Sequence, residues 1–406
     1  MDTSECGAEI CSLDDLRADI PLTRQYIYLN SCTFGPVPRS IQACMADALR
    51  AENEEIIAIR GKKAGVRFYS RAEQARCTLA DLLGVSAGDV AWTYNTTTAT
   101  RLAIMGIGWQ PGDKLAVTDV EHVSTNRAAA GLAQSRGVET TVIPSTGPGE
   151  AVYAGPDLFL EQLDRLLTPA HRMLVMSHVS NIDGRRLPVT EAARMARARG
   201  VRTLVDGAQS LGIFTVDAAA MGADFYSGSV HKWLLGPPGI GFLFVSSNSR
   251  KEFNPFDFPV LKDDTGDAER APMTASALCE LGTANYALRI GAGACVETAR
   301  RIGLGKIEER CRLLTARLRA GLRLVPGIRV ASPEEWELSS SVTTIQLDEG
   351  TPERCQRFVE RLLEEYGIVV KYRPEICGVR IGVAGFNTNE EIEQFLAATV
   401  HLIPQI

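Results

Sequence analysis

The sequence has no apolar run approaching the roughly 18–20 residues that a membrane-spanning helix requires. Its start is not cationic either. Five carboxylates precede the first basic residue, Arg17, which argues against a signal peptide or a mitochondrial presequence. The formal net charge of -6 leaves no basic excess for a nucleic-acid surface. We therefore expect a cytoplasmic protein with no membrane and no nucleic-acid partner.

Metal-binding and redox motifs are also missing. Ten cysteines are present, but none forms a C-x-x-C pair, and no histidine stands near one at zinc-ligand spacing. Without an export signal we expect reduced cysteines, mostly packed as small apolar side chains, and no metal. Lysine is scarce, with eight among the 43 basic residues. A lysine inside an apolar, glycine-flanked segment therefore needs an explanation of its own.

What the sequence does have is a regular alternation of short apolar runs and helical segments. With 406 residues, 45% hydrophobic and 23% charged, it has ordinary globular composition and room for two or three domains. Strands that alternate with helices predict an α/β fold with a seven-stranded, mostly parallel sheet, and ligands bind such sheets outside the carboxyl ends of the strands. The predicted strands are 89–94, 114–119, 139–144, 172–179, 201–207, 223–229 and 239–246.

The pattern changes after about residue 281, beyond a Pro-rich and charged segment at 250–280. We predict a large domain at 41–275 and a smaller α+β domain that combines 1–40 with 281–406. The elements expected after 281 are a long helical stretch at 285–324, strands at 340–348, 367–373 and 378–383, and helices near 352–366 and from 388.

The strongest constellation joins TLVDGAQSLG at 203–212 to SGSVHKWLLGPPGIG at 227–241. Asp206 ends an apolar strand, and Lys232 follows 26 residues later in an apolar setting. A buried lysine avoids the cost of desolvation through a lowered pKa or through a Schiff base with an aldehyde cofactor. An aspartate aimed at a pyridine nitrogen keeps that nitrogen protonated. Each residue alone also reads as a solvated lysine or a helix-capping aspartate, but the linked pair favours a pyridoxal phosphate site.

The segment VDGAQS…SVHKWLLGPPGIG resembles the signature of the class V aminotransferases. These are fold type I pyridoxal-phosphate enzymes and include cysteine desulfurases and isopenicillin N epimerase-like proteins. The resemblance extends from about Tyr28 to Phe395 and recurs in several separate motifs. It implies the fold type I transferase architecture, pyridoxal 5'-phosphate as cofactor, and an enzyme that acts at the Cα of an amino acid.

The resemblance also implies a role for each matching residue of the cofactor site. Lys232 matches the Schiff-base lysine, Asp206 the partner of the pyridine nitrogen, and Gln209 the residue that binds the phenolic oxygen.

The remaining cofactor contacts concern the phosphate. A helix N-terminus with hydroxyl groups is independently an anion site, although threonines there also serve as plain helix caps. In TYNTTTATRLAI the family's phosphate-binding positions are occupied by Thr96 and Thr97, and Ser229 and His231 match the phosphate contacts beside the lysine.

Further matches concern the ring and the substrate. His122 resembles the histidine that stacks over the ring, although a lone histidine after a strand is often structural. Asn181 falls near the ring and substrate, or forms a turn before Asp-Gly. Arg380 matches the arginine whose fork suits a substrate carboxylate, with an ordinary surface arginine as the alternative. Asn30 lies in the substrate-side N-terminal segment, and Thr283 resembles the segment that completes the partner's phosphate site in a homodimer.

The resemblance leaves the reaction open. A desulfurase needs a mobile cysteine whose thiolate attacks the substrate sulfur. Only six residues separate Arg373 from Arg380, so Cys377 is tethered, and it is at least as readily a packed thiol. We therefore predict a C–S β-lyase of an S-substituted cysteine or cystine. The alternatives are an aminotransferase, epimerase or decarboxylating deaminase of specialised metabolism, a cysteine desulfurase, or a cofactor-free scaffold on the same fold.

Overall fold

Seven strands form one sheet, in the order β2-β8-β7-β6-β5-β3-β4, in this computed structural model, which describes residues 10–57, 62–146, 153, 155–256 and 273–406. Every pairing is parallel except those that β8 makes with β2 and β7. The predicted seven-stranded, mostly parallel sheet is confirmed. The strands are β2 (Val90–Thr93), β3 (Lys114–Thr118), β4 (Glu139–Ile143), β5 (His171–Ser177), β6 (Arg202–Asp206), β7 (Phe225–Ser229) and β8 (Gly241–Val245).

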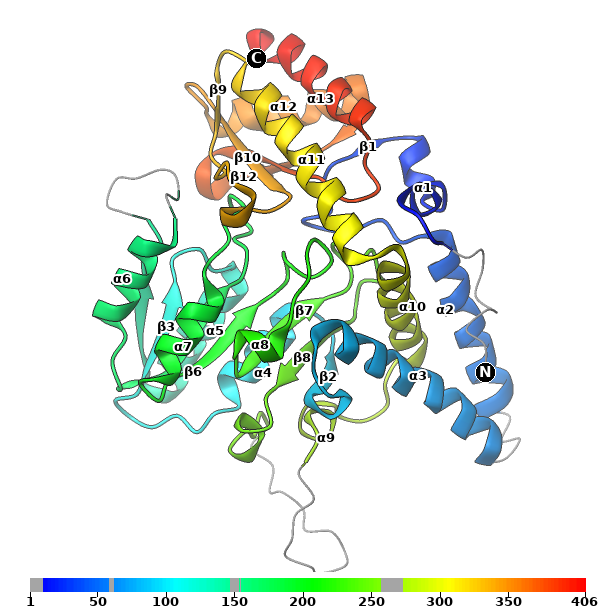
Figure 1. The fold of residues 1–406 in the computed structure, drawn as a ribbon, viewed down its shortest axis with the longest axis vertical. Helices are drawn as coiled ribbons and strands as arrows, with labels where there is room; N and C mark the ends of the chain where they lie inside the picture. The colour runs from blue at the N-terminus through cyan, green and yellow to red at the C-terminus, as the bar shows by residue number, and fades with distance from the viewer. Residues whose placement is uncertain (1–9, 58–61, 147–152, 154, 257–272) are drawn as a thin grey trace, which may run out of the picture.

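Helices cover both faces of this sheet (Figure 1). Successive side chains of a strand point to opposite faces, so Met173 and Val175 of β5 join one apolar cluster, and Leu174 and Met176 join the other. The first cluster includes side chains of α4 (Thr96–Met105), α5 (Val123–Arg136) and α9 (Ala275–Cys279). The second includes α3 (Lys62–Leu83), α6 (Pro156–Leu166), α7 (Val189–Arg197), α8 (Ala218–Met221) and α10 (Tyr286–Ile302).

A smaller antiparallel sheet, in the order β12-β13-β10-β9, lies beyond the large one (Figure 1). The N-terminal segment joins this region, because β1 (Ile27–Tyr28) pairs in parallel with β11 (Ile368–Val369). The other elements here are β9 (Ile328–Val330), β10 (Val342–Leu347), β12 (Lys371–Arg373), β13 (Gly378–Gly382), α11 (Leu304–Arg323), α12 (Pro352–Tyr366) and α13 (Asn389–Leu402).

The predicted helical stretch at 285–324 is two helices. Gly303 separates α10 from α11 with a φ of 95°, a conformation that only glycine adopts without strain. The break lets α10 pack on α3 and on α2 (Arg39–Ala51), while α11 packs on α13 and β9. The domain boundaries remain a prediction, and most of the separating segment at 250–280 lies outside the described residues.

A buried arginine ties α11 to the small sheet. The Arg319 side chain is 2% exposed, and its Nε donates to Thr343 Oγ1 at 3.0 Å. Its terminal nitrogens donate to four oxygens at 2.6–2.9 Å, those of Pro333, Ser339, Ser340 and Val342. Burial lowers the pKa of Arg319 to about 10. Hydrogen bonds to neutral oxygens therefore hold this guanidinium, with no ion pair in the described part of the chain.

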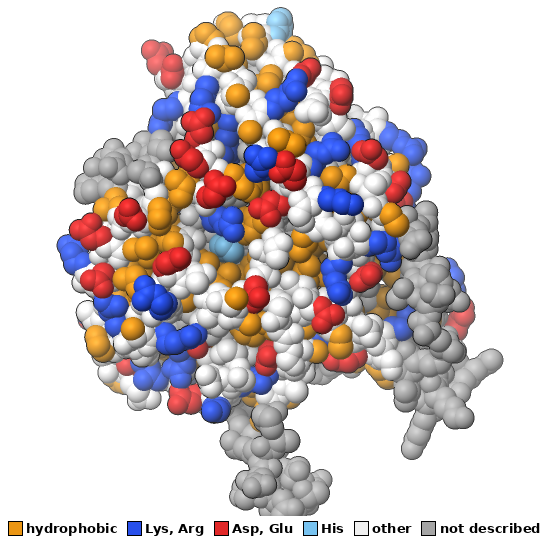
Figure 2. Space-filling model, viewed as in Figure 1, with side chains coloured by type: hydrophobic (Ala, Val, Ile, Leu, Met, Phe, Trp, Pro, Cys, Tyr) orange, Lys and Arg blue, Asp and Glu red, His pale blue; other side chains and the backbone are white. Residues whose placement is uncertain are grey.

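The surface seen in Figure 2 carries basic and acidic side chains interspersed, without a broad region of one sign. Among the described helices, none combines the length and the apolar character needed to cross a membrane.

Candidate active site

Polar side chains gather where three neighbouring strands end. β5 ends at Ser177, β6 at Asp206 and β7 at Ser229, and parallel pairing brings these ends to the same edge of the sheet. The strands that end at Asp206 and Ser229 are neighbours in the sheet. The edge is therefore a place where residues far apart in the sequence meet.

An anion cradle lies at the start of α4. Asn95 caps the helix, and the Thr96 N–H donates to Ser229 Oγ at 3.0 Å; the two hydroxyls are also in contact. The backbone N–H of Thr97 has no hydrogen-bond partner among the described residues. Two residues after Ser229, the Nδ1 atom of His231 is buried and has no hydrogen-bond partner among the described residues. Unpaired N–H groups at the positive end of a helix suit a phosphate.

Asp206 and Lys232 interact across the strand edge. Asp206 is 6% exposed, and its Oδ1 accepts the Ala208 N–H at 2.9 Å, while Oδ2 has no hydrogen-bond partner in the described structure. Burial raises the pKa of Asp206, and Lys232 opposes that rise. Burial likewise lowers the pKa of Lys232 to about 8, against the attraction of Asp206. A carboxylate oxygen and an amine are thus both available to a ligand.

His122 is fixed by its own helix. It is the N-cap of α5, and Nδ1 accepts the Ser124 N–H at 3.2 Å, which leaves the proton of a neutral ring on Nε2. Burial lowers the pKa of His122, while Asp206 acts in the opposite direction. The imidazole is therefore neutral near pH 7 and lies within the electrostatic reach of Asp206 and Lys232.

The preceding residue, Glu121, was not predicted as a site residue. Its Oε1 accepts hydrogen bonds from the Thr118 hydroxyl and the Ser177 N–H, both at 2.6 Å, and Oε2 is buried with no partner in the described structure. Burial raises the pKa of Glu121 to about 7, and Asp206 adds to the rise. The only signal in the sequence was a carboxylate next to His122 at the end of an apolar run.

A second cluster surrounds Arg380, which is 3% exposed. One terminal nitrogen donates to the main-chain oxygen of Asn181 at 2.8 Å and the other to Thr33 Oγ1 at 2.8 Å. The Thr33 hydroxyl donates in turn to Asn30 Oδ1 at 2.8 Å. Arg373, not predicted as a site residue, donates to Asn181 Oδ1 at 2.6 Å. The structure therefore brings Asn30, Asn181 and Arg380 together and adds a second guanidinium.

Gln209 connects the N-terminal segment that contains Asn30 and Thr33 to the loop after β7 that carries Lys232 (the lysine loop). Its Nε2 donates to the Cys32 carbonyl at 3.0 Å, and its Oε1 accepts from Trp233 Nε1 at 2.9 Å. One amide hydrogen remains for a ligand. The Cys32 thiol is also close to the site: burial raises its pKa, while Arg380 and Lys232 act to lower it.

The same segment touches the lysine loop through the backbone. The Gly35 N–H donates to the His231 carbonyl at 2.7 Å, and a Cβ on Gly35 would lie 2.0 Å from the Lys232 carbonyl oxygen. Only glycine fits this approach.

Two residues singled out in the sequence lie elsewhere. Thr283 is exposed ahead of α10 and makes no hydrogen bond within the described chain. Cys377 has a φ of 45°; its Sγ donates to the Gly350 carbonyl, and its carbonyl accepts from Cys355 Sγ, both at 3.3 Å. Cys377 packs against the apolar cluster around the small antiparallel sheet (the small region).

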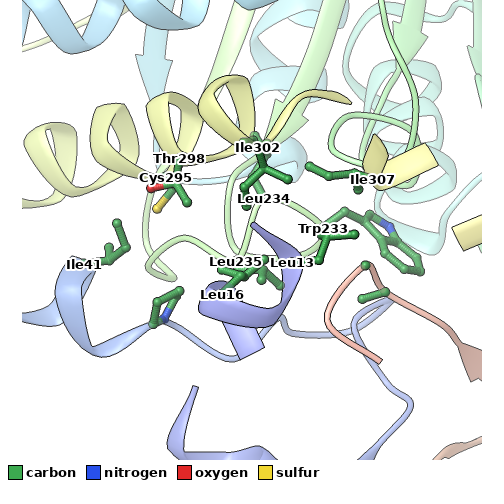
Figure 3. Close-up of a pocket in the computed structure, with 14 residues that line it drawn as sticks. Leu13, Leu16, Ile41, Trp233, Leu234, Leu235, Cys295, Thr298, Ile302 and Ile307 are labelled. Carbon is green, nitrogen blue, oxygen red and sulfur yellow. The ribbon is translucent and has the colours of Figure 1, made fainter. Parts of the chain in front are cut away.

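The apolar residues after Lys232 pack around a small cavity (Figure 3). Trp233, Leu234 and Leu235 meet Leu13 and Leu16 of α1 (Leu13–Ala18), and residues of α10 complete the wall. The cavity holds about 30 Å³, the space of roughly one water molecule. It is a packing void behind the lysine loop, too small for a substrate.

The comparisons with known proteins agree on one family. The family model "Aminotransferase class-V" matches residues 27–395. A probable cysteine desulfurase of Methanothermobacter thermautotrophicus is 31% identical over 78% of this chain and 77% of its own. An isopenicillin N epimerase of Amycolatopsis lactamdurans is 28% identical over 95% of this chain and 97% of its own. The apo structure of a cysteine desulfurase from Thermococcus onnurineus NA1 superposes with a TM-score of 0.84 and 25% identity, over 97% and 98% of the chains.

The residues present fit the cofactor of that family. The unpaired Thr97 N–H suits a phosphate, and the free Oδ2 of Asp206 suits a protonated ring nitrogen. The amine of Lys232, with its pKa lowered to about 8, suits condensation with an aldehyde. The chain belongs to the class V aminotransferase family and is a pyridoxal-phosphate-dependent enzyme.

Proposed function

We propose that this enzyme is a C–S β-lyase that cleaves an S-substituted cysteine or cystine. The proposal rests on one observation above all: Cys377, the cysteine nearest in sequence to Arg380, is held by Gly350 and Cys355 in the small region. A desulfurase needs a thiolate that reaches the substrate sulfur. A β-lyase needs none, because the substrate thiolate is itself the leaving group.

The proposed roles follow the two clusters. Thr96, Thr97, Ser229 and His231 would hold the phosphate, and Gln209 the phenolic oxygen. Asp206 would hold the proton on the ring nitrogen, and His122, fixed by Ser124, would stack on the ring. When bound, pyridoxal phosphate supplies an electron-accepting ring that stabilises negative charge at the substrate Cα.

The remaining residues position the substrate and move its proton. The Arg380 guanidinium would bind the substrate carboxylate. Asn181 holds the guanidinium directly, and Asn30 holds it through the Thr33 hydroxyl. Lys232 takes the Cα proton at Nζ. The C–S bond then breaks, the thiolate leaves with the bonding electrons, and the three-carbon remainder hydrolyses to pyruvate and ammonia.

The relatives support two other outcomes at the same site. Several are named cysteine desulfurases, and Cys32 is a thiol near Lys232 and Arg380 that such a reaction would need. Another is named an isopenicillin N epimerase, in which the product keeps its side chain. Transamination and decarboxylation at Cα remain further alternatives.

A product assay separates these reactions. The holoenzyme is given S-substituted L-cysteines and cystine, and thiol, pyruvate, persulfide and the recovered amino acid are measured. We expect thiol and pyruvate, with most activity retained in Cys377→Ser and in Cys32→Ser. Loss of turnover in either variant, with a persulfide on that cysteine in the wild type, would show a desulfurase. Racemised substrate without thiol would show an epimerase.

The cofactor attachment has its own test. Borohydride treatment of the holoenzyme should fix the cofactor to one peptide that contains Lys232. A Lys232→Ala protein that is still labelled would refute the role given to this lysine.

We also propose a homodimer in which the exposed Thr283 reaches the phosphate site of a second copy. A monomer in sedimentation that has full cofactor occupancy and activity would end this idea. Thr283→Ala in a dimer should weaken cofactor retention.

A further inference from the structure

A second cavity lies away from the lysine loop. Its volume is about 230 Å³, and residues from the loop after β5, from the start of α7 and from 337–338 line it. The Arg186 N–H donates to the Leu338 carbonyl at 2.8 Å, so the cavity lies where the large-sheet region meets the small one.

The helix α7 begins at this cavity. Its first residues, Val189, Thr190 and Glu191, are part of the lining, and no side chain caps it at Pro188. The N–H groups of Thr190 and Glu191 have no partner among the described residues. The positive end of a nine-residue helix is therefore open to a negatively charged group.

Two buried polar side chains are also among the residues that line the cavity. His178 is 5% exposed, and neither ring nitrogen has a hydrogen-bond partner among the described residues; burial lowers its pKa to about 3. Tyr153 is 2% exposed, and its hydroxyl likewise has no partner within the described part of the chain. Leaving a buried polar group unsatisfied is costly, so each is a reason to expect a ligand.

The charged groups of the cavity have both signs. The guanidinium of Arg186 lies over the Phe214 ring, 3.9 Å from its centroid, and forms no hydrogen bond or ion pair within the described chain. Glu191 and Glu337 are exposed at the rim. Among the lining residues, two carboxylates thus accompany one guanidinium. A multiply charged anion would meet repulsion here, whereas a molecule with one positive and one negative end would not.

We propose that this cavity binds a small zwitterion of the amino-acid class, distinct from the substrate at Lys232. The carboxylate end would lie between Arg186 and the start of α7. The ammonium end would lie near Glu337, and His178 and Tyr153 would hydrogen-bond to the bound molecule. None of the residues given to the proposed reaction lines this cavity, so binding here is independent of that reaction.

The test is calorimetric titration of the holoenzyme with L-proline, sarcosine and glycine betaine, which lack the primary amine that the cofactor needs. At least one should bind, while acetate and pyrrolidine, each carrying one of the two charges, should bind about tenfold more weakly or not at all. Arg186→Gln and the exposed Glu337→Gln should each weaken binding about tenfold, equivalent to about 1.4 kcal/mol.

Two matched controls locate the bound molecule. Arg136→Gln, at an exposed position on α5, and Arg380→Gln, in the substrate cluster, should leave the affinity unchanged. The proposal is overturned if none of the three zwitterions binds or if acetate binds equally well. It is also overturned if binding survives both Arg186→Gln and Glu337→Gln, or is lost in Arg380→Gln.

Discussion

Arg380 donates a hydrogen bond to the main-chain oxygen of Asn181 at 2.8 Å and so fixes β13 of the small sheet to the loop after β5. The other terminal nitrogen donates to Thr33, and Nε is buried with no partner in the part of the chain that the structure describes. The guanidinium thus approaches the site in one orientation, set by three segments of the chain.

Arg380→Lys should raise KM for the amino-acid substrate about tenfold to a hundredfold, with a smaller change in kcat. An ammonium cannot keep both protein contacts and also form a two-point bond to a carboxylate. Steady-state kinetics with S-substituted cysteines measures this. Lys371→Gln is the control, because Lys371 pairs with Arg380 in the sheet but has an exposed side chain. An unchanged KM would remove Arg380 from the substrate site.

Cofactor uptake by the cofactor-free protein should depend on pH through Lys232. Burial lowers the pKa of this amine to about 8, so the neutral, nucleophilic form becomes the main one above that pH. The rate of covalent attachment, followed by stopped-flow absorbance, should rise with a midpoint near 8. Asp206→Asn, which removes an attraction that favours the charged amine, should move the midpoint lower. A midpoint near 10, that of free lysine, would contradict the burial of Lys232.

Glu121 should make stability fall as pH rises. Its pKa is raised from 4.5 to about 7 in the folded protein, so the folded state binds the proton more tightly than the unfolded state. This contribution to the free energy of unfolding is present below pH 4.5 and is lost as pH rises through 7, a change of about 3 kcal/mol. Glu121→Gln keeps an oxygen for Thr118 and Ser177 and should remove that dependence. Urea unfolding between pH 5 and 8 checks it, and parallel curves for both proteins would contradict it.

Arg319→Met should lower the free energy of unfolding by about 3 kcal/mol or more, because several buried oxygens lose their donor. The matched control is Arg317→Met on the same helix. Arg317 is half exposed and pairs with Glu393 at the surface, so its loss should cost at most about 1 kcal/mol. Urea denaturation of both variants measures the difference; equal losses would show that the Arg319 network adds nothing.

Six of the seven strands could be predicted because each is a short apolar run buried on both faces, and the edge strand β4, largely exposed, could be predicted from its β-branched residues. Asp206 and Lys232 could be predicted because polar groups at the ends of such runs are unusual. The same logic failed at Gly303, where the helical pattern continues through a glycine that the chain uses to turn α10 away from α11.

Three of the residues missed at the site could not be predicted for a different reason. Arg373, Thr33 and Cys32 acquire their place only through tertiary contacts with Asn181, Arg380 and Gln209. Nothing in their own sequence neighbourhoods distinguishes them from surface or core residues. Thr283 differs from these three residues: the sequence resemblance marks it, but the role it implies lies in the site of a second copy of the chain.

The contact of Gly35 with the lysine loop ties the N-terminal segment to the backbone around Lys232. Its N–H reaches the His231 carbonyl, and its bare Cα lies against the backbone of Lys232. A substitution or truncation near residue 35 therefore acts directly on the backbone of Lys232, the residue proposed to carry the cofactor. Such a change would reveal itself first as faded yellow colour in a protein that is otherwise still folded.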